Sequence, residues 1–273
     1  MYKSILSLLL VCSIAFTAAA QQSEYYSDII ALNRQCMLSQ RVVKSYLAQH
    51  SLKDKNQALF IKGSFESFKL VQNELLEKSK NPAIIDKLKH MNTLWDVYSF
   101  FIEDDFDQDN ATSTVEMSDK LTLVCNEVIE LYKAEADSKL VSKKEIAFLG
   151  AIQEVGVLST YANMAMVRLM SHSNKVGFEE VVKKQYADLK AGIENIVKDL
   201  KSFKYNSPNV NTKIDEFSSL TTSFFKDADV TISGAKFDEA ALKKLLGDAD
   251  YLSKSADELA SMYEVLAIES TQN

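Results

Sequence analysis

The sequence predicts an all-α protein made of two tandem antiparallel four-helix bundles. Apolar residues recur at the spacing of a helix face along almost the whole chain. Only 7 glycines and 2 prolines occur among 273 residues, which is few for a fold rich in turns. No stretch reads as a confident strand, because the best candidate, DVTIS at 229–233, is too short to pair alone.

The first twenty residues predict a signal peptide. Lys3 supplies a positive start, ILSLLLVCSIAF an apolar run, and AAAQQ a small-residue cleavage site after Ala20. An uncleaved anchor is one alternative, and a lipoprotein at Cys12 is another, although Val11 before it is not small. The apolar run is shorter than the span of about 20 residues that crosses a membrane. We therefore expect cleavage and a soluble periplasmic or secreted protein.

Eight helices follow from the apolar periodicity, and the breaks between them have recognisable causes. Pro82 suits a helix start, where its missing N–H costs little. The acidic stretch DDFDQDNATS and the segments SPNVN and DVTISGAKFD, with Pro208 and Gly234, are predicted loops. Long helices joined by short connections favour antiparallel neighbours. The expected ranges are 24–50, 55–79, 82–104, 113–137, 140–173, 177–203, 209–229 and 238–270.

An internal repeat underlies the prediction of two bundles. CMLSQRVVKSYLA at 36–48 lies 120 positions before GVLSTYANMAMVR at 156–168. NEVIELYKAEA at 126–136 resembles ADELASMYEVL at 256–266. The common order of these features indicates a duplication.

The repeat divides the mature chain into a module at 22–139 and a second at 140–273. The fourth helix of the first module either ends before the second module or runs into its first helix. At the offset of 120, Tyr161 takes the place of Arg41, so the matching strip has lost its charge. We expect the second module to be mainly structural.

Composition argues against several functions. Acidic residues outnumber basic ones by 38 to 31, which disfavours nucleic acid as a partner. The three histidines are not spaced as metal ligands, and the acidic loop at 103–110 lacks the glycine and glutamate of a calcium loop. No glycine-rich phosphate loop or nucleophile motif occurs. We expect a protein that is not an enzyme and has no metal or cofactor.

Two cysteines, Cys36 and Cys125, remain after removal of the signal peptide. They fall at equal depth in the expected first and fourth helices, which are antiparallel neighbours in such a bundle. A disulfide between them is possible, and it would stabilise an unstrained fold by about 4 kcal/mol. Two buried free thiols, or a bridge from Cys36 across a dimer, are the alternatives.

The stretch LNRQCMLSQRVVKSYL, residues 32–47, carries the candidate site. Arg34 and Arg41 lie seven positions apart and share one helix face. Two guanidiniums on one face repel unless an anion or carboxylates lie between them, and their geometry suits a planar oxyanion or carboxylate. The alternative is internal pairing with acids of the expected fourth helix, namely Glu127, Glu130 or Glu135.

The segment NRQCMLSQR resembles the signature of the N-terminal sensory module of type IV pili methyl-accepting chemotaxis transducers (PilJ-type). That module is similar to the periplasmic domain of NarX-like nitrate and nitrite sensors. FESFKLVQNELLE, Trp95 and NEVIELYKAEA follow in the order of the family. Asn33 replaces a glycine of the family pattern, and Cys36 replaces an arginine. The matching positions are Arg34, Gln35, Met37, Leu38, Ser39, Gln40 and Arg41.

The resemblance implies a helical, extracytoplasmic, ligand-binding module, often present in tandem copies with the second one degenerate. In the nitrate-binding relatives the first helices of two subunits pair, and arginines from both hold an anion at the dimer axis. The expected ligand here is a small anion or a carboxylate, with a membrane receptor or a homodimer as possible partners. No output domain is expected in this chain, and the alternative is a structural or interaction bundle without a small ligand. The expected ligand-binding residues are Arg34, Gln35, Ser39, Gln40 and Arg41.

Overall fold

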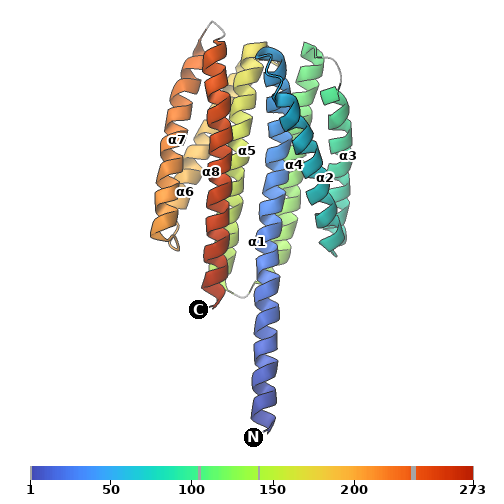
Figure 1. The fold of residues 1–273 in the computed structure, drawn as a ribbon, viewed down its shortest axis with the longest axis vertical. Helices are drawn as coiled ribbons and strands as arrows, with labels where there is room; N and C mark the ends of the chain where they lie inside the picture. The colour runs from blue at the N-terminus through green and yellow to red at the C-terminus, as the bar shows by residue number, and fades with distance from the viewer. Residues whose placement is uncertain (1, 104–105, 141, 235–237, 273) are drawn as a thin grey trace.

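Eight long helices run up and down, side by side, and make up the whole regular structure of the described residues (Figure 1). The computed structural model describes residues 2–103, 106–140, 142–234 and 238–272, with side chains between residues 24 and 270. The predicted all-α bundle is therefore confirmed. The helices are α1 (Tyr2–Ser51), α2 (Gln57–Lys78), α3 (Pro82–Glu103), α4 (Gln108–Asp137), α5 (Lys143–Asn174), α6 (Glu179–Lys201), α7 (Pro208–Ser233) and α8 (Glu239–Gln272).

Capping residues explain where several helices begin. The Asp107 side chain accepts a hydrogen bond from the Asn110 N–H, so α4 begins at Gln108, five residues before the predicted start. Ser142 and Glu145 form a reciprocal capping box at the start of α5. Because α4 ends at Asp137 and α5 begins at Lys143, the two helices are separate and not continuous.

The predicted loop and candidate strand at 229–233 are wrong, because this segment forms the end of α7. Its β-branched residues suggested an extended chain. Ile232 is buried on the same face as Ala228 and Phe225, so the helix gains apolar burial from continuing to Ser233. Tertiary packing outweighs the weak local preference here.

Helix α1 extends beyond the end of the bundle toward the N-terminus (Figure 1). The predicted signal peptide, residues 1–20, lies outside the residues whose side chains are described, so its cleavage stays a prediction. In the part of the chain described with side chains, no helix combines the length and apolarity needed to span a membrane.

Helices α1 and α5 lie next to each other in the middle of the molecule and run in parallel (Figure 1). Helix α1 also packs against α2, α4 and α8, while α5 packs against α6 and α8. One hydrophobic core runs without interruption through both halves of the chain, from Tyr26 in α1 to Tyr263 in α8. The two halves thus share a core across the α1–α5 contact.

The buried positions recur between the first four helices and the last four. Each of the twelve buried residues of α4 has a buried counterpart 131 positions later in α8. The same holds for the five buried residues of α2 at 125 positions and for the five of α3 at 126 positions. Corresponding helices therefore turn corresponding faces to the core.

For α1 and α5 the exposed and half-buried positions correspond best at an offset of 123, not at the 120 of the sequence match. The two offsets differ by three residues, which is close to one helical turn. Both therefore align apolar residues with apolar residues, and the sequence alone does not distinguish them. The structural counterpart of Arg41 is consequently Met164 and not Tyr161. The counterpart of Asn33 is Gly156, and the two residues lie against each other.

Gly156→Ala is expected to destabilise the protein by about 2 kcal/mol, since overpacking typically costs about 1–3 kcal/mol. A Cβ at residue 156 would lie 2.0 Å from Cγ and 2.4 Å from Cβ of Asn33, so α1 and α5 would have to move apart. Guanidinium chloride unfolding measures the change.

Gly150→Ala is the matched control, because a Cβ at that position of the same helix meets nothing within 4 Å. It should be neutral or stabilising by up to about 1 kcal/mol through helix propensity. Adding Asn33→Ala should restore only a small part of the stability of Gly156→Ala, because Cβ of residue 33 would remain 2.4 Å from the new Cβ. Equal stability of the two glycine variants would show that the close approach is not needed.

Candidate functional site

A polar groove lies between α1 and α8, with part of α5 at its base. Its volume is about 320 Å³. We call it the α1–α8 groove. It is lined by Met37 and Arg41 of α1, Asn163 of α5, and Asp250, Ser253, Lys254 and Asp257 of α8.

Helical spacing places these side chains together. On α8 the four lining residues are separated by three, one and three positions, so they share one face. On α1, Met37 and Arg41 are one turn apart. The buried stripes of both helices flank this face, and therefore the apolar core fixes the position of the polar groups.

Arg41 is the half-buried cation of the groove. Its guanidinium lies over the Phe60 ring, 5.1 Å from the centroid, an arrangement that restricts its orientation. Within the described residues neither Arg41 nor Arg34 has a carboxylate within 4.0 Å. Arg41 therefore brings into the groove a positive charge that no carboxylate of the described residues pairs with directly.

Asp257 is the half-buried anion of the groove. Burial raises the pKa of its carboxyl, and the positive charges of Arg34 and Arg41 act in the opposite direction. These guanidiniums are near enough to act through space but too far to form an ion pair. Among the described residues, the Asp257 carboxylate accepts no hydrogen bond.

Lys44 lies buried beneath the groove and forms an ion pair with Asp250. Burial lowers the pKa of the Lys44 ammonium, whereas Asp250 raises it. Asp250 is thus already matched by an internal charge. Asp257, the other acid of the groove, forms no ion pair with the described residues.

The base of the groove is made of hydrogen-bonding side chains. Asn163 is fully buried and donates to the Ser253 hydroxyl at 2.6 Å and to the Ser159 carbonyl at 2.9 Å. Its Oδ1 is buried and has no donor within the described part of the chain. A buried acceptor without a donor is costly, so this atom favours a ligand or water that donates.

The structure does not bring the five predicted site residues together. Of these, Arg41 lines the groove and Arg34 is exposed on the same side of α1. Gln35, Ser39 and Gln40 are buried, and their side chains serve the packing of α1 against α2 and α4.

The contacts of these three buried residues are internal. Gln35 donates to the Phe68 carbonyl of α2, and Gln40 donates to the Thr122 hydroxyl of α4 at 2.9 Å. Ser39 donates to the Cys36 carbonyl at 2.7 Å. The bonds of Gln35 and Gln40 join α1 to α2 and α4, the bond that Ser39 donates lies within α1, and none of the three residues lines the groove.

The acids considered as internal partners of the arginines are engaged elsewhere. Glu127 pairs with Lys87, Glu135 pairs with Lys139, and Glu130 accepts from Gln153. The acid that lies near both arginines is Asp257 of α8, which the sequence analysis missed. The polar spacing of α8 within an apolar helix is visible in the sequence, but a division into two separate modules predicts neighbours of α1 from the first module only.

Cys36 and Cys125 form a disulfide that joins α1 to α4, with their Cα atoms 5.7 Å apart. Both residues are buried. Cys36 directly precedes Met37 of the groove, so the bond anchors this turn of α1 to the first half of the bundle.

A second groove, of about 350 Å³, occupies the corresponding position between α4, α5 and α6. Asp119, Thr122, Leu123 and Asn126 stand there at the places of Asp250, Ser253, Lys254 and Asp257, at the α4–α8 offset of 131. Met164 stands at the place of Arg41. Its buried cation, Arg168, forms an ion pair with Asp119, so the described residues of this groove provide no free guanidinium like that of Arg41.

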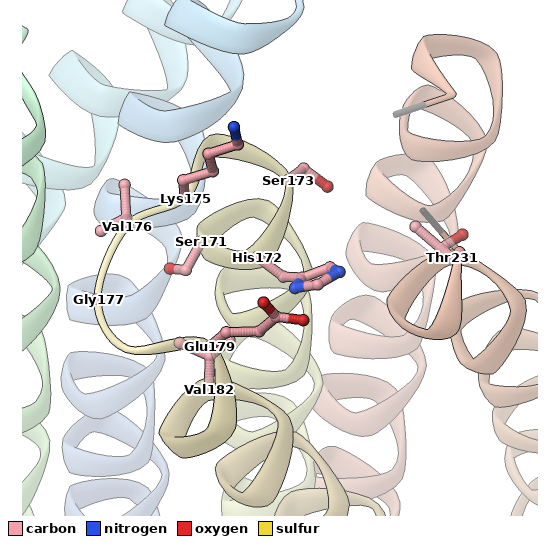
Figure 2. A pocket seen from close by; sticks show the side chains of 10 residues that line it. Ser171, His172, Ser173, Lys175, Val176, Gly177, Glu179, Val182 and Thr231 are labelled. Carbon is pink, nitrogen blue, oxygen red and sulfur yellow. The ribbon is translucent and has the colours of Figure 1, made fainter. Parts of the chain in front are cut away.

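A larger depression of about 550 Å³ surrounds the turn between α5 and α6 (Figure 2). Figure 2 shows the Glu179 carboxylate pointing toward the His172 ring, with Thr231 of α7 across the opening. Glu179 also pairs with Lys183. The rim of the depression at Gly234 adjoins residues outside the described set, so we do not take it as the site.

The described residues contain no group of three or more histidine, cysteine or acidic side chains placed to hold a metal ion. Fold and groove define a class: an eight-helix bundle with a small, charged surface groove. The chain matches no model of a known protein family, no curated protein and no solved structure.

Proposed function

We propose that the protein is an exported, sensory-type helical protein that binds a small anion or a carboxylate in the α1–α8 groove. The observation that supports this most directly is the guanidinium of Arg41, which is half-buried, lines the groove and lacks an ion pair among the described residues. Guanidinium binds a carboxylate or oxyanion through two parallel hydrogen bonds. Lys254, on the other wall, adds a second positive charge, although its ammonium also lies 3.9 Å from the Glu258 carboxylate.

The resemblance to PilJ-type modules supports a related arrangement. In the nitrate-binding relatives two subunits pair through their first helices, whereas here α5 of the same chain packs along α1. We therefore propose that two tandem modules, 22–139 and 140–273, take the place of two subunits. The proposed anion site lies beside this pair of helices, against α8.

Arg41→Met is expected to weaken binding of any anionic ligand at least tenfold, because a charge-assisted hydrogen bond contributes about 1.5–3 kcal/mol and tenfold is about 1.4 kcal/mol. Methionine is the residue at the structural counterpart, Met164, so the variant should fold. A thermal-shift screen with nitrate, nitrite, sulfate, acetate and dicarboxylates, followed by calorimetry on any ligand found, measures the loss.

Arg34→Met is the matched control, because it removes the same charge from the same helix without touching the groove. It should change affinity less, and its effect should fade with added salt. If no anion raises the unfolding midpoint and Arg41→Met changes stability alone, the chain is better described as a structural or interaction bundle. Equal losses from both arginine variants would place the site elsewhere on α1.

A further inference from the structure

The α1–α8 groove carries charges of both signs in a small volume. Arg41 and Lys254 are positive, and Asp250 and Asp257 are negative. Lys44 already neutralises Asp250 from below, so the acid left over is Asp257. A simple anion would satisfy the guanidinium but would be repelled by this carboxylate.

The hydrogen-bonding groups of the groove also argue against a simple anion as the ligand. The Asp257 carboxylate and the Asn163 Oδ1 both accept hydrogen bonds, and neither receives one from the described residues. Nitrate, sulfate and acetate ions cannot donate to them. An ammonium group can donate three hydrogen bonds and also offsets the charge of Asp257.

We propose that the ligand is a small zwitterion with a carboxylate and a primary ammonium, such as a free amino acid. Its carboxylate binds Arg41, with Lys254 nearby, and its ammonium donates to Asp257 and to Asn163 Oδ1. This inference rests on the proposed function and names the ligand class for the same groove.

The size of the groove limits the ligand further. Ligand pockets in proteins span about 300–1,000 Å³, and this groove, at about 320 Å³, is at the lower end. One amino acid fits that volume, and a longer peptide would extend into solvent. The polar lining favours small or polar side chains over large apolar ones.

The first experiment compares zwitterions with their separate halves. The full-length mature protein is titrated with the twenty amino acids, acetate, nitrate, methylammonium and trimethylglycine, using thermal shift and calorimetry. At least one amino acid should bind ten times more tightly than acetate, nitrate or methylammonium. Trimethylglycine should bind weakly, because its quaternary nitrogen has no N–H to donate.

Three results are distinguishable. Tight binding of an amino acid supports the inference. Binding of acetate or nitrate as tight as that of every amino acid overturns it and leaves the anion proposal standing. Absence of binding by the whole panel overturns both.

Asp257→Asn provides the decisive variant, because it keeps the shape of the side chain and removes its charge. Amino-acid affinity should fall at least tenfold, while affinity for acetate or nitrate should stay the same or rise. Arg41→Met should lower both. Asparagine already occupies the corresponding position of α4, at Asn126, so a folded variant is expected, and its unliganded unfolding midpoint checks this. Unchanged amino-acid affinity in Asp257→Asn would refute the role of the carboxylate.

Discussion

Loss of the Cys36–Cys125 disulfide is expected to lower the free energy of unfolding by about 4 kcal/mol. The bond closes a long loop, since the two cysteines are 89 positions apart, and a long loop restricts the unfolded chain strongly. For a chain of this size that loss corresponds to a fall in unfolding midpoint of roughly 10 °C. Denaturant unfolding of the oxidised protein and of a Cys36→Ala, Cys125→Ala double variant measures it.

Both sulfurs are buried, so reductant must act while the chain is partly unfolded. Wild-type protein that has been unfolded and refolded in dithiothreitol should match the double variant, and the double variant itself should not respond to dithiothreitol. Mass spectrometry under non-reducing conditions gives an independent check. Two free thiols in freshly purified protein would rule out the bond.

Asp119→Asn is expected to cost about 3 kcal/mol, the lower end of the range for leaving one member of a buried ion pair alone. Nη2 of Arg168 donates to both carboxylate oxygens of Asp119, at 2.8 and 2.6 Å. The Arg168 side chain is only 3% exposed, whereas that of Asp119 is 28% exposed. Because Asp119 is partly exposed, we expect a loss of stability at the lower end of that range. Guanidinium keeps its charge at any ordinary pH, so the variant would retain a buried cation without an anion.

Asp250→Asn is the matched comparison at the corresponding position of α8. It removes the partner of Lys44, which is as deeply buried as Arg168. Lysine differs because it can lose its proton, and burial already lowers the pKa of this ammonium. We expect a smaller loss, about 1–2 kcal/mol, since Asp250 is also more exposed. Chemical denaturation of both variants at neutral pH decides between this order and its reverse.

The fold was largely predictable because helix periodicity, capping residues and the scarcity of glycine and proline agree along the chain. The ends of α2 and α3 lie within two residues of prediction. The error at 229–233 arose where β-branched residues stand at a helix end, and there burial of Ile232 decides the conformation. No local pattern reports that burial.

The site was only partly predictable. Arg41 was found from its charge and spacing, but its neighbours Asp257 and Lys254 belong to a helix more than two hundred positions away. Gln35, Ser39 and Gln40 looked like surface groups because they are polar. Their burial depends on the packing of α2 and α4 against α1, which supplies the acceptors of Gln35 and Gln40 and is a property of the assembled bundle and not of the strip.

The parallel contact of α1 with α5 has a consequence for how such a protein can evolve. In a pair of identical subunits, every residue on the axis meets its own copy, and two asparagines at the level of Asn33 would collide as the Cβ of an alanine at 156 would. Joining both halves in one polypeptide frees each side to mutate alone. An asparagine on one helix can then pack against a glycine on the other, as Asn33 does against Gly156. One half of the chain can acquire a binding site while the other half keeps only a structural role.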